Sequence, residues 1–316
     1  MEVIVKNIIK EADDIISLEL VNENNQDLVP FTAGSHIDVH LSNGLIRQYS
    51  LCNSPSEVHR YVVGILNDPN SRGGSKFIHE TLKVGDTLQI SEPRNLFPLV
   101  ENAKKSIFIA GGIGITPILS MAKKLSQDHQ DFDFHYCSRS LNKAAFLEEM
   151  KNSTFSKNTN FYFDDGAPET KFNIENILGN PDSDTHLYVC GPSGFLHFVL
   201  ETAEKFGWSD KNVHREYFSA APQFDAVDNA FDIEIKSSGE ILHVPANKKV
   251  IDVLMEHDID IPISCEQGVC GTCVTGVLSG IPDHRDMFLT NEERDQNDQF
   301  TPCCSRSNSR LLVLDL

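Results

Sequence analysis

The sequence predicts a multidomain protein, with an antiparallel β-barrel first, an α/β domain with a parallel sheet second and an α+β domain last. Three observations lead to this fold class. Short alternating strands separated by turn signals fill residues 1–100, which is typical of a small barrel. Within residues 106–207, two apolar strands each run into a glycine turn and a helix, as in parallel α/β sheets. A hairpin, a helix and a closing strand follow within residues 231–316.

The predicted barrel contains two stretches whose side chains suit a phosphorylated ring compound. In IRQYSL, Arg47 can bind a phosphate through two hydrogen bonds, Tyr49 can stack on a ring system, and the Ser50 hydroxyl can reach a ring nitrogen. In SRGGSKFIHE (71–80), a glycine pair and Ser75 stand at the head of a predicted helix, where an anion can bind. Each stretch alone also fits a plain barrel strand and a plain capped helix.

The middle of the chain begins with SIFIAGGIGITPILSMAKKL, which predicts a strand, a glycine turn and an amphipathic helix. Gly111, Gly112 and Gly114 would let a pyrophosphate approach the backbone at the positive end of that helix. Thr116 is the predicted N-cap and Pro117 suits the first helical turn. The pattern G-G-x-G-x-T-P departs from G-x-G-x-x-G, so the turn alone is weak support for a nucleotide.

Two further stretches favour a nucleotide site. FDFHYCSRS predicts a second strand that ends near Ser138 and Arg139, where α/β sheets hold the adenosine ribose. THLYVCGPSGFLHFVLETAEKFG predicts a third strand, a tight turn through Cys190, Gly191 and Pro192, and a helix. The carboxyl ends of parallel strands form the usual ligand crevice. Cys190 alone also fits a buried thiol with no role in binding.

Near the C-terminus, three crowded cysteines predict an iron–sulfur cluster. Cys265, Cys270 and Cys273 have the C-x4-C-x2-C spacing of plant-type [2Fe-2S] ferredoxins. A fourth ligand must come from downstream, and Cys303 leaves the typical gap of 29 residues, with Cys304 as a small buried neighbour. Zinc remains an alternative, although structural zinc sites usually combine two short cysteine pairs, and only one C-x2-C pair is present here.

The flanks of these cysteines predict a compact fold around them. FDIEIKSSGEILHVPA (231–246) alternates and turns at Ser238-Gly239, as a hairpin does, and KKVIDVLMEHDIDI (248–261) has helical spacing of its apolar residues. LLVLDL at the end is a predicted closing strand. The HRD tripeptide at 284–286 has none of the companion motifs of a kinase and is expected to be a surface loop.

Composition narrows the classes of function. The net charge of −19 makes nucleic-acid binding unfavourable. The N-terminus lacks the apolar region of a signal peptide, and no apolar stretch is long enough to span a membrane. Eight cysteines without an export signal suggest reduced thiols or metal ligation rather than disulfides. We therefore expect a cytoplasmic protein.

The motifs R-x-Y-S, G-G-S, G-G-x-G-x-T-P, C-G-P and C-x4-C-x2-C-x29-C, in this order, resemble those of the phthalate dioxygenase reductase family across essentially the whole chain. The resemblance implies an FMN-binding, ferredoxin-reductase-like barrel at residues 1–101, an NAD(H)-binding domain at 104–222 and a β-grasp ferredoxin domain at 229–316. FAD-dependent relatives usually carry the ferredoxin first or lack it, so this order favours FMN.

The resemblance also implies roles for individual residues. Arg47 would bind the FMN phosphate, and Gln48, Tyr49 and Ser50 would border the flavin. Phe218, or alternatively Tyr217, would cover the flavin. The remaining residues expected around the flavin and the nucleotide are Gly74, Ser75, Gly111, Gly112, Gly114, Thr116, Pro117, Ser138, Arg139, Cys190, Gly191 and Pro192, with Ser50, Cys190 and Phe218 next to the reacting atoms. Cys265, Cys270, Cys273 and Cys303 would be the cluster ligands.

The implied activity is that of a reductase component of a two-component oxygenase. A hydride would pass from NADH to FMN, and single electrons would then pass through the [2Fe-2S] cluster to a terminal Rieske-type oxygenase. The predicted ferredoxin domain has 15 acidic and 7 basic residues, a net charge of −8 that would steer it towards a basic partner. NADH is expected over NADPH because Arg139 is the only basic residue that directly follows the second strand. A monomer is expected. A redox-sensing or carrier protein without a dedicated oxygenase, and a flavin monooxygenase, are the alternatives.

Overall fold

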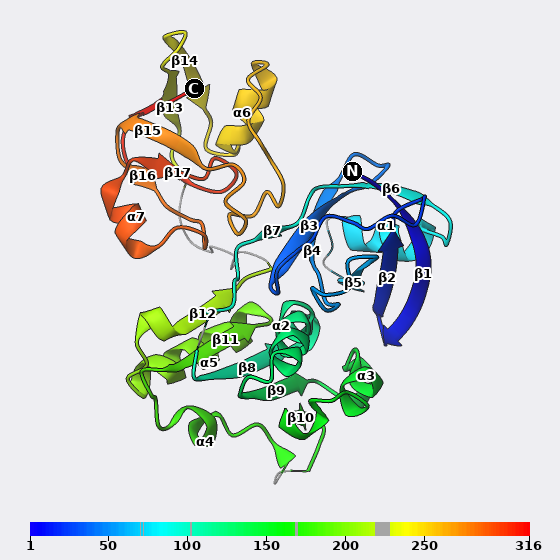
Figure 1. Cartoon of the computed structure of the whole chain (residues 1–316). Helices are drawn as coiled ribbons and strands as arrows, with labels where there is room; N and C mark the ends of the chain where they lie inside the picture. The colour runs from blue at the N-terminus through cyan, green and yellow to red at the C-terminus, as the bar shows by residue number, and fades with distance from the viewer. Residues whose placement is uncertain (70, 72, 102, 168–169, 219–227) are drawn as a thin grey trace. The chain divides into compact units, whose positions relative to one another are not determined.

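The computed structural model describes residues 1–69, 71, 73–101, 103–167, 170–218 and 228–316. Contacts divide the chain into two compact units, Met1–Glu216 and Tyr217–Leu316. Figure 1 shows the two sheets of the first unit, in blue to green, and the second unit, in yellow to red. The three domains predicted from the sequence stay a prediction as to their boundaries, and the predicted boundary at residue 222 lies outside the described residues.

The first sheet of the first unit is an antiparallel barrel. Its strands run in the order β4-β3-β6-β1-β2-β5, with β7 paired to β3. A bridge between Leu51 and Val63 joins the segment after β4 to β5, so the first and last strands of this order meet. The elements are β1 (Glu2–Ala12), β2 (Ile15–Val21), β3 (Ser35–His40), β4 (Ile46–Ser50), β5 (Tyr61–Leu66), α1 (Gly74–Thr81), β6 (Thr87–Ile90) and β7 (Arg94–Asn95).

The barrel forms because its strands alternate apolar and polar residues. Along β2, Leu18 and Leu20 are buried, and in β5 Tyr61, Val63 and Ile65 are fully buried. Alternation places every second side chain on the inner face of a strand. The inner faces of the barrel strands and Ile78 of α1 share one apolar core, which confirms the predicted barrel.

The second sheet of the first unit is parallel throughout, in the order β10-β9-β8-β11-β12. Helix α2 packs on β8, β9 and β11, while α5 packs on β11 and β12. The elements are β8 (Lys105–Gly111), η1 (Gly112–Gly114), α2 (Ile115–Gln127), β9 (Phe132–Ser138), η2 (Leu141–Lys143), α3 (Leu147–Lys151), η3 (Ser156–Asn158), β10 (Thr159–Phe163), α4 (Ile174–Leu178), β11 (Thr185–Cys190), α5 (Ser193–Lys205), η5 (Asp210–Asn212) and β12 (Val213–Glu216).

The barrel and the parallel sheet are joined by a common apolar core. Phe108 and Tyr188 of the parallel sheet, and Met121 of α2, belong to the same buried cluster as Ile15 and Phe97 of the barrel region. Burial of apolar surface across both sheets explains why residues 1–216 form one compact unit. Figure 1 shows α2 on the side of the parallel sheet that faces the barrel.

The second unit is an α+β fold. Its main sheet has the order β14-β13-β19-β15-β17, in which β13 and β19 are parallel, and β16 pairs separately with β18. The predicted hairpin, helix and closing strand are confirmed, although the helix is shorter than its apolar pattern. The elements are β13 (Phe231–Ile235), β14 (Glu240–Val244), α6 (Val250–Glu256), β15 (Thr275–Ser279), β16 (Pro282–Asp283), α7 (Asn291–Gln296), β17 (Gln299–Phe300), β18 (Arg306–Ser307) and β19 (Leu311–Leu314).

One predicted cap is wrong. Helix α2 begins at Ile115 with Gly114 as its N-cap, so Thr116 lies inside the first turn. The Thr116 hydroxyl donates a hydrogen bond to the carbonyl of Ile113 at 3.1 Å. The 3₁₀ turn η1 immediately before α2 already winds the chain, and the helix therefore starts earlier than threonine preference suggests. Pro117 falls in the first turn, as predicted.

Candidate functional site

The parallel sheet has a point at which its strand order reverses, between β8 and β11. From β8 the chain proceeds to β9 and β10 on one side, and from β11 it proceeds to β12 on the other. Ligands of open α/β sheets bind in the crevice beyond the carboxyl ends of strands at such a point. Here the strands end at Gly111 of β8 and Cys190 of β11. Each of these residues begins one of the two turns that the sequence predicts at the ligand crevice.

The three glycines of the first turn serve different purposes. A Cβ on Gly114 would lie 2.3 Å from the carbonyl oxygen of Cys190, and a Cβ on Gly111 would lie 2.8 Å from the Phe195 ring. These two glycines are therefore required by packing against β11 and α5. Gly112, at φ 54°, would place its Cβ in open space and is the glycine whose backbone a ligand can approach.

A cavity of about 750 Å³ lies next to this turn. One wall comes from the parallel sheet and the other from barrel residues, among them Asp14 and Leu66. Lys143 pairs with Asp14 at 2.5 Å, and Lys171 donates a hydrogen bond to the carbonyl of Asp164. The predicted residues that line the cavity are Gly111, Gly112, Ser138, Arg139 and Pro192. Its lining does not include Gly114, Thr116, Pro117, Cys190 or Gly191.

The barrel strand β4 places Arg47 against the first turn of α1. A Cβ on Gly74 would lie 2.6 Å from Cγ and Nε of Arg47, so only glycine lets the guanidinium group come this close. The N-cap of α1 is Gly73, at φ 97°, which has no side chain to cap the helix. The N–H groups of the first turn and the Arg47 side chain together fit a phosphate. The Ser75 hydroxyl accepts a hydrogen bond from the N–H of Asp68 at 3.4 Å.

The other side chains of β4 differ in their surroundings. Tyr49 packs against the barrel core, where burial raises the pKa of its hydroxyl. Gln48 faces away from it and donates a hydrogen bond to the Asp38 carboxylate at 3.1 Å. Arg94 also binds Asp38, at 2.7 and 2.8 Å. The Gln48 side chain therefore contacts strand β3, and its role at the flavin stays a prediction.

At the end of β4, Ser50 meets an acid from the parallel sheet. The Ser50 hydroxyl donates a hydrogen bond to Oε2 of Glu216 at 3.2 Å, and the Cys190 Sγ lies 4.0 Å from the same oxygen. Cys190 and Glu216 are register partners in the pairing of β11 with β12. Although Glu216 as a residue is partly exposed, burial of its carboxyl group raises the pKa to about 8. At neutral pH this carboxyl group holds a proton.

Besides Ser50, the residues predicted next to the reacting atoms are Cys190 and Phe218. Burial raises the pKa of the Cys190 thiol well above its ordinary value, so Cys190 is a neutral thiol beside Glu216. Phe218 belongs to the second unit and is 38% exposed. Its role as a cover for the flavin, and that of Tyr217 as the alternative, stays a prediction.

In the second unit, the four predicted cysteine ligands form two pairs. Cys265 hydrogen-bonds to Cys270, and Cys303 to Cys273; each contact lowers the pKa of the accepting thiol, that of Cys270 and that of Cys273. All four cysteines are buried. Backbone N–H groups of Gln267 and Thr272 point to the sulfur atoms of Cys265 and Cys270 at 3.4 and 3.5 Å.

Two thiol pairs fit a cluster with two irons better than a single zinc ion. In the part of the chain that the structure describes, no three His, Cys, Asp or Glu side chains converge on one metal position. A structural zinc site needs four ligands around one point, whereas a [2Fe-2S] cluster needs two thiolates on each iron. The pairing fits Cys265 with Cys270 on one iron and Cys273 with Cys303 on the other.

The HRD tripeptide is not the exposed loop that its sequence predicts. Asp286 is 2% exposed, and its carboxylate accepts hydrogen bonds from the N–H groups of Phe288 and Leu289 at 3.1 and 2.7 Å. A Cβ on Gly268 would lie 3.0 Å from Cα of Asp286, and the N–H of Met287 donates to the Gly268 carbonyl at 2.8 Å. Residues 286–289 therefore form a wall against the cysteine loop.

Cys304 also differs from its prediction, since it is only partly buried. A Cβ on Gly268 would lie 2.4 Å from its sulfur. The Sγ of Cys304 and the Thr301 hydroxyl lie 3.2 Å apart. The Cys304 side chain packs against the cysteine loop and also hydrogen-bonds to Cys303, which is 1% exposed and pairs with Cys273 as well.

Comparisons with known proteins agree with both units. Residues 233–308 match the 2Fe-2S iron-sulfur cluster binding domain, and residues 91–213 match the N-terminal domain of the DmmA-like dimethylamine monooxygenase subunit. A vanillate O-demethylase oxidoreductase from a Pseudomonas species is 54% identical over 100% of both chains. The solved structure of phthalate dioxygenase reductase has a TM-score of 0.78 and 36% identity, over 100% of this chain and 98% of that one. The chain belongs to the phthalate dioxygenase reductase family.

Family membership makes this reductase an oxidoreductase of the electron-transfer type, and it implies a flavin, NAD(H) and a [2Fe-2S] cluster. A type IV self-sufficient cytochrome P450 monooxygenase contains a similar region, with a TM-score of 0.86 and 36% identity over 100% of this chain and 41% of that one. Among the described helices of this reductase, none has the length and apolar character needed to cross a bilayer.

Sequence reasoning missed two residues of the reductase. Glu216 lies in VHREYFSA, and nothing in that stretch shows that β12 places its carboxyl group beside Ser50. A carboxylate at the end of an edge strand beside the predicted ligand crevice is the signal that could have found it. Asp286 is the second such residue, because the HRD tripeptide is expected to be a surface loop. The D-x-F-L stretch, however, is a short turn in which an aspartate can accept backbone hydrogen bonds.

Proposed function

We propose that this reductase is the NADH-dependent component of a two-component Rieske-type oxygenase system that demethylates vanillate or a similar methoxylated aromatic acid. The observation that carries this proposal is the 54% identity to a vanillate O-demethylase oxidoreductase over the full length of both chains. The proposed form is a cytoplasmic monomer with FMN and one [2Fe-2S] cluster.

When bound, the flavin accepts a hydride from the nicotinamide and releases electrons singly, and the cluster carries one electron at a time. The protein contributes position and electrostatics. Arg47 and the N-terminal turn of α1 bind the flavin phosphate, and Gly112 leaves the backbone open to the pyrophosphate. Ser138 and Arg139 line the cavity at the adenosine end.

Glu216 has a proposed role that the sequence did not suggest. Its carboxyl group holds a proton at neutral pH and lies within hydrogen-bonding distance of Ser50, at the end of the strand that carries Arg47 and Tyr49. A neutral carboxyl group at this position adds no negative charge beside the flavin and the nicotinamide. Ser50 and Cys190 hold the carboxyl group in place from either side.

FMN is proposed over FAD for two reasons. The order barrel, nucleotide domain, ferredoxin resembles the FMN-dependent members of the family. In addition, Arg47 at the start of α1 forms a compact seat for one phosphate group. Releasing the flavin from purified protein and measuring its mass decides the question, and an FAD mass would contradict the FMN assignment.

The decisive experiment combines purified reductase with the oxygenase component of a vanillate O-demethylase. NADH added without oxygen should bleach both the flavin and the cluster absorption. With oxygen and vanillate, formaldehyde release should then require both components. If NADPH is used more efficiently than NADH, the predicted preference for NADH at Ser138 and Arg139 is wrong. If no NADH-dependent bleaching occurs, the proposed function fails.

A different acceptor is a specific alternative. The similarity to a region of a self-sufficient cytochrome P450 monooxygenase shows that the same three folds also occur fused to another oxygenase type. A carrier or redox sensor without a dedicated oxygenase is a further alternative. The P450 acceptor would be favoured by one result: NADH reduces the flavin and the cluster, no Rieske-type oxygenase turns over, and a P450 haem is reduced.

A further inference from the structure

Helix α2 carries a stripe of polar residues next to its apolar, buried residues. Ser120, Lys123 and Gln127 recur at spacings of three and four residues, which places them on one side of the helix. Their neighbours Leu119, Met121 and Ala122 are fully buried in the core shared by barrel and parallel sheet. Ser120 is itself 0% exposed and the Lys123 side chain is 16% exposed.

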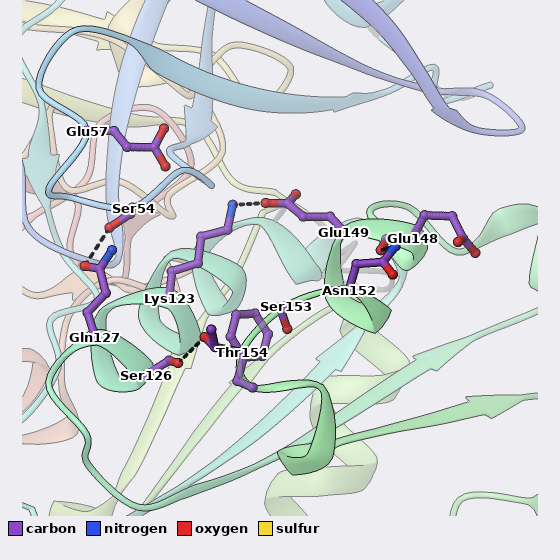
Figure 2. A pocket seen from close by; sticks show the side chains of 11 residues that line it. Ser54, Glu57, Lys123, Ser126, Gln127, Glu148, Glu149, Asn152, Ser153 and Thr154 are labelled. Carbon is purple, nitrogen blue, oxygen red and sulfur yellow. Dashed lines mark hydrogen bonds and ion pairs between the residues drawn. The ribbon is translucent and has the colours of Figure 1, made fainter.

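The stripe binds three consecutive residues of the barrel. Lys123 Nζ donates to the carbonyl of Cys52 at 2.9 Å, and the Ser120 hydroxyl donates to the carbonyl of Asn53 at 2.9 Å. The Ser54 hydroxyl donates to Oε1 of Gln127 at 2.9 Å. Figure 2 shows the Ser54–Gln127 bond and the position of Lys123 at the edge of a pocket of about 660 Å³.

The residues bound by α2 follow directly after β4, the strand that carries Arg47, Tyr49 and Ser50 and is called the flavin strand below. Cys52 follows Ser50 by two positions, and its N–H donates to the carbonyl of Val62 in β5 at 2.9 Å. The Asn53 side chain accepts a hydrogen bond from the N–H of Val62 at 2.9 Å. Segment 52–54 is therefore held by β5 on one side and by α2 on the other, with no carbonyl of Cys52 or Asn53 left without a partner.

The opposite end of α2 belongs to the nucleotide turn. Gly114 caps the helix, and Gly112 stands two residues before that cap. A Cβ on Gly64 of the barrel would lie 2.7 Å from the Thr116 methyl group, so the helix start also lies close against the barrel. One rigid helix thus connects the turn at the nucleotide crevice to the segment that follows the flavin strand.

We propose that Ser120, Lys123 and Gln127 are positioning residues that fix the nicotinamide pocket in register with the flavin strand. This proposal rests on the proposed function. Apolar contacts in the shared core are non-directional and would tolerate sliding of the helix along the barrel. Hydrogen bonds have preferred lengths and angles, and three of them to consecutive residues define one position of α2.

The remaining partner of Lys123 supports a fixed position for its side chain. Glu149 of α3 pairs with Nζ at 2.6 Å, as Figure 2 shows. The lysine is therefore held by an acid of the parallel-sheet region while it donates to the barrel. A lysine that served only solubility would extend into water, as Lys124 does on the next position of the same helix with 44% exposure.

The test uses the holoenzyme with Ser120→Ala and Lys123→Met combined, and Lys124→Met as the matched control. Because ångström-scale misplacement of reacting groups costs up to about 100-fold in rate, the double variant should show a limiting rate of anaerobic flavin reduction by NADH at least about 10-fold below wild type. The NADH Kd should stay within about twofold. The visible circular dichroism of the oxidised flavin should change, since it reports the flavin surroundings without turnover.

Lys124 pairs only with Asp128 of its own helix among the described residues, so Lys124→Met should match wild type in all three measurements. Lys123→Arg keeps a donor for Cys52 and should recover most of the rate. If the double variant does not fold, Ser120→Ala and Gln127→Ala are measured singly with the same expectations at smaller size.

The proposal is overturned if the folded double variant, with full flavin content, keeps a limiting rate within about twofold of wild type. It is also overturned if rate, NADH affinity and Tm all fall together, because the stripe would then only hold the fold. Failure of wild-type protein itself to be reduced by NADH would instead refute the proposed function.

Discussion

The hydroxyl of Ser50 and the carboxyl group of Glu216 are 3.2 Å apart, and this contact links β4 of the barrel to β12, the edge strand of the parallel sheet. The two residues are 166 positions apart in sequence. Their contact brings a protonated acid to the end of the strand on which Arg47 and Tyr49 lie.

The first prediction concerns the pH dependence that Glu216 confers. Its pKa of about 8 predicts that flavin reduction by NADH decreases as the pH rises through 8, where the carboxyl group becomes charged. Glu216→Gln keeps a neutral hydrogen-bonding side chain and should remove this decrease. Stopped-flow measurements between about pH 6 and 9 compare the two proteins. An unchanged pH profile in the variant would exclude Glu216 as the titrating group.

The same acid predicts a change of stability with pH. The unfolded chain releases the proton near the ordinary pKa of 4.5, whereas the folded protein retains it up to about pH 8. The folded state therefore binds more protons within this window, and the contribution of Glu216 to the free energy of unfolding falls as pH rises through it. Urea denaturation should show Glu216→Gln gaining stability over wild type at pH 8.5 relative to pH 6.

A third prediction tests the cluster ligands. Cys303→Ser should abolish the visible absorption of the cluster while flavin reduction by NADH continues, because Cys303 forms the buried pair with Cys273. Cys304→Ser should retain the cluster, because a serine hydroxyl can keep both the contact with the loop at Gly268 and the hydrogen bond to Cys303. Iron and sulfide content measured on both variants supplies a second readout. The reverse result would assign the fourth ligand to Cys304.

The glycine turn gives a prediction about stability. Gly114→Ala would place a methyl group 2.3 Å from the backbone oxygen of Cys190, and the free energy of unfolding should fall by about 1–3 kcal/mol. Gly194→Ala is the matched control, because nothing lies within 4 Å of its Cβ in helix α5. That variant should gain about 0.4–1 kcal/mol. Equal stabilities for the two variants would show that the contact with Cys190 is not tight.

The last prediction concerns the encounter with the oxygenase. Residues 229–316 carry a net charge of −8. Electron transfer to a basic oxygenase surface should therefore slow several-fold when the salt concentration rises from about 0.05 to 0.5 M, since salt screens exposed charges. Flavin reduction by NADH, followed in the same buffers, should change much less. A transfer rate that does not depend on salt would remove electrostatic steering from the mechanism.

Local patterns predicted the elements of the fold well. The alternating strands of the barrel, the strand–turn–helix at Gly111 and the hairpin at residues 231–246 all form as expected, because each depends on neighbours in sequence. The pairing of Cys303 with Cys273 also agrees with the spacing argument. The ligand role of these cysteines stays a prediction, which rests on the fixed spacing of cluster ligands along the chain.

Contacts between distant segments were beyond the reach of the sequence. Glu216 becomes part of the site only because β12 pairs with β11 and ends opposite Cys190. The place of Gly114 beside a ligand stays a prediction, but only the structure shows that the carbonyl of Cys190 occupies the space where its Cβ would be. Asp286 is predicted to lie on the surface, whereas its burial depends on the fold of the cysteine loop against it. In each case the deciding atom belongs to another part of the chain.

Glu216 is also the final residue of β12, a four-residue strand at the margin of its sheet. The backbone leads from this acid directly into the unit that carries the cysteines. Ser50 is therefore hydrogen-bonded to the last residue of the first unit. Separation of β12 from β11 would remove Ser50 from its hydrogen-bond partner, so this contact depends on the pairing of one short edge strand.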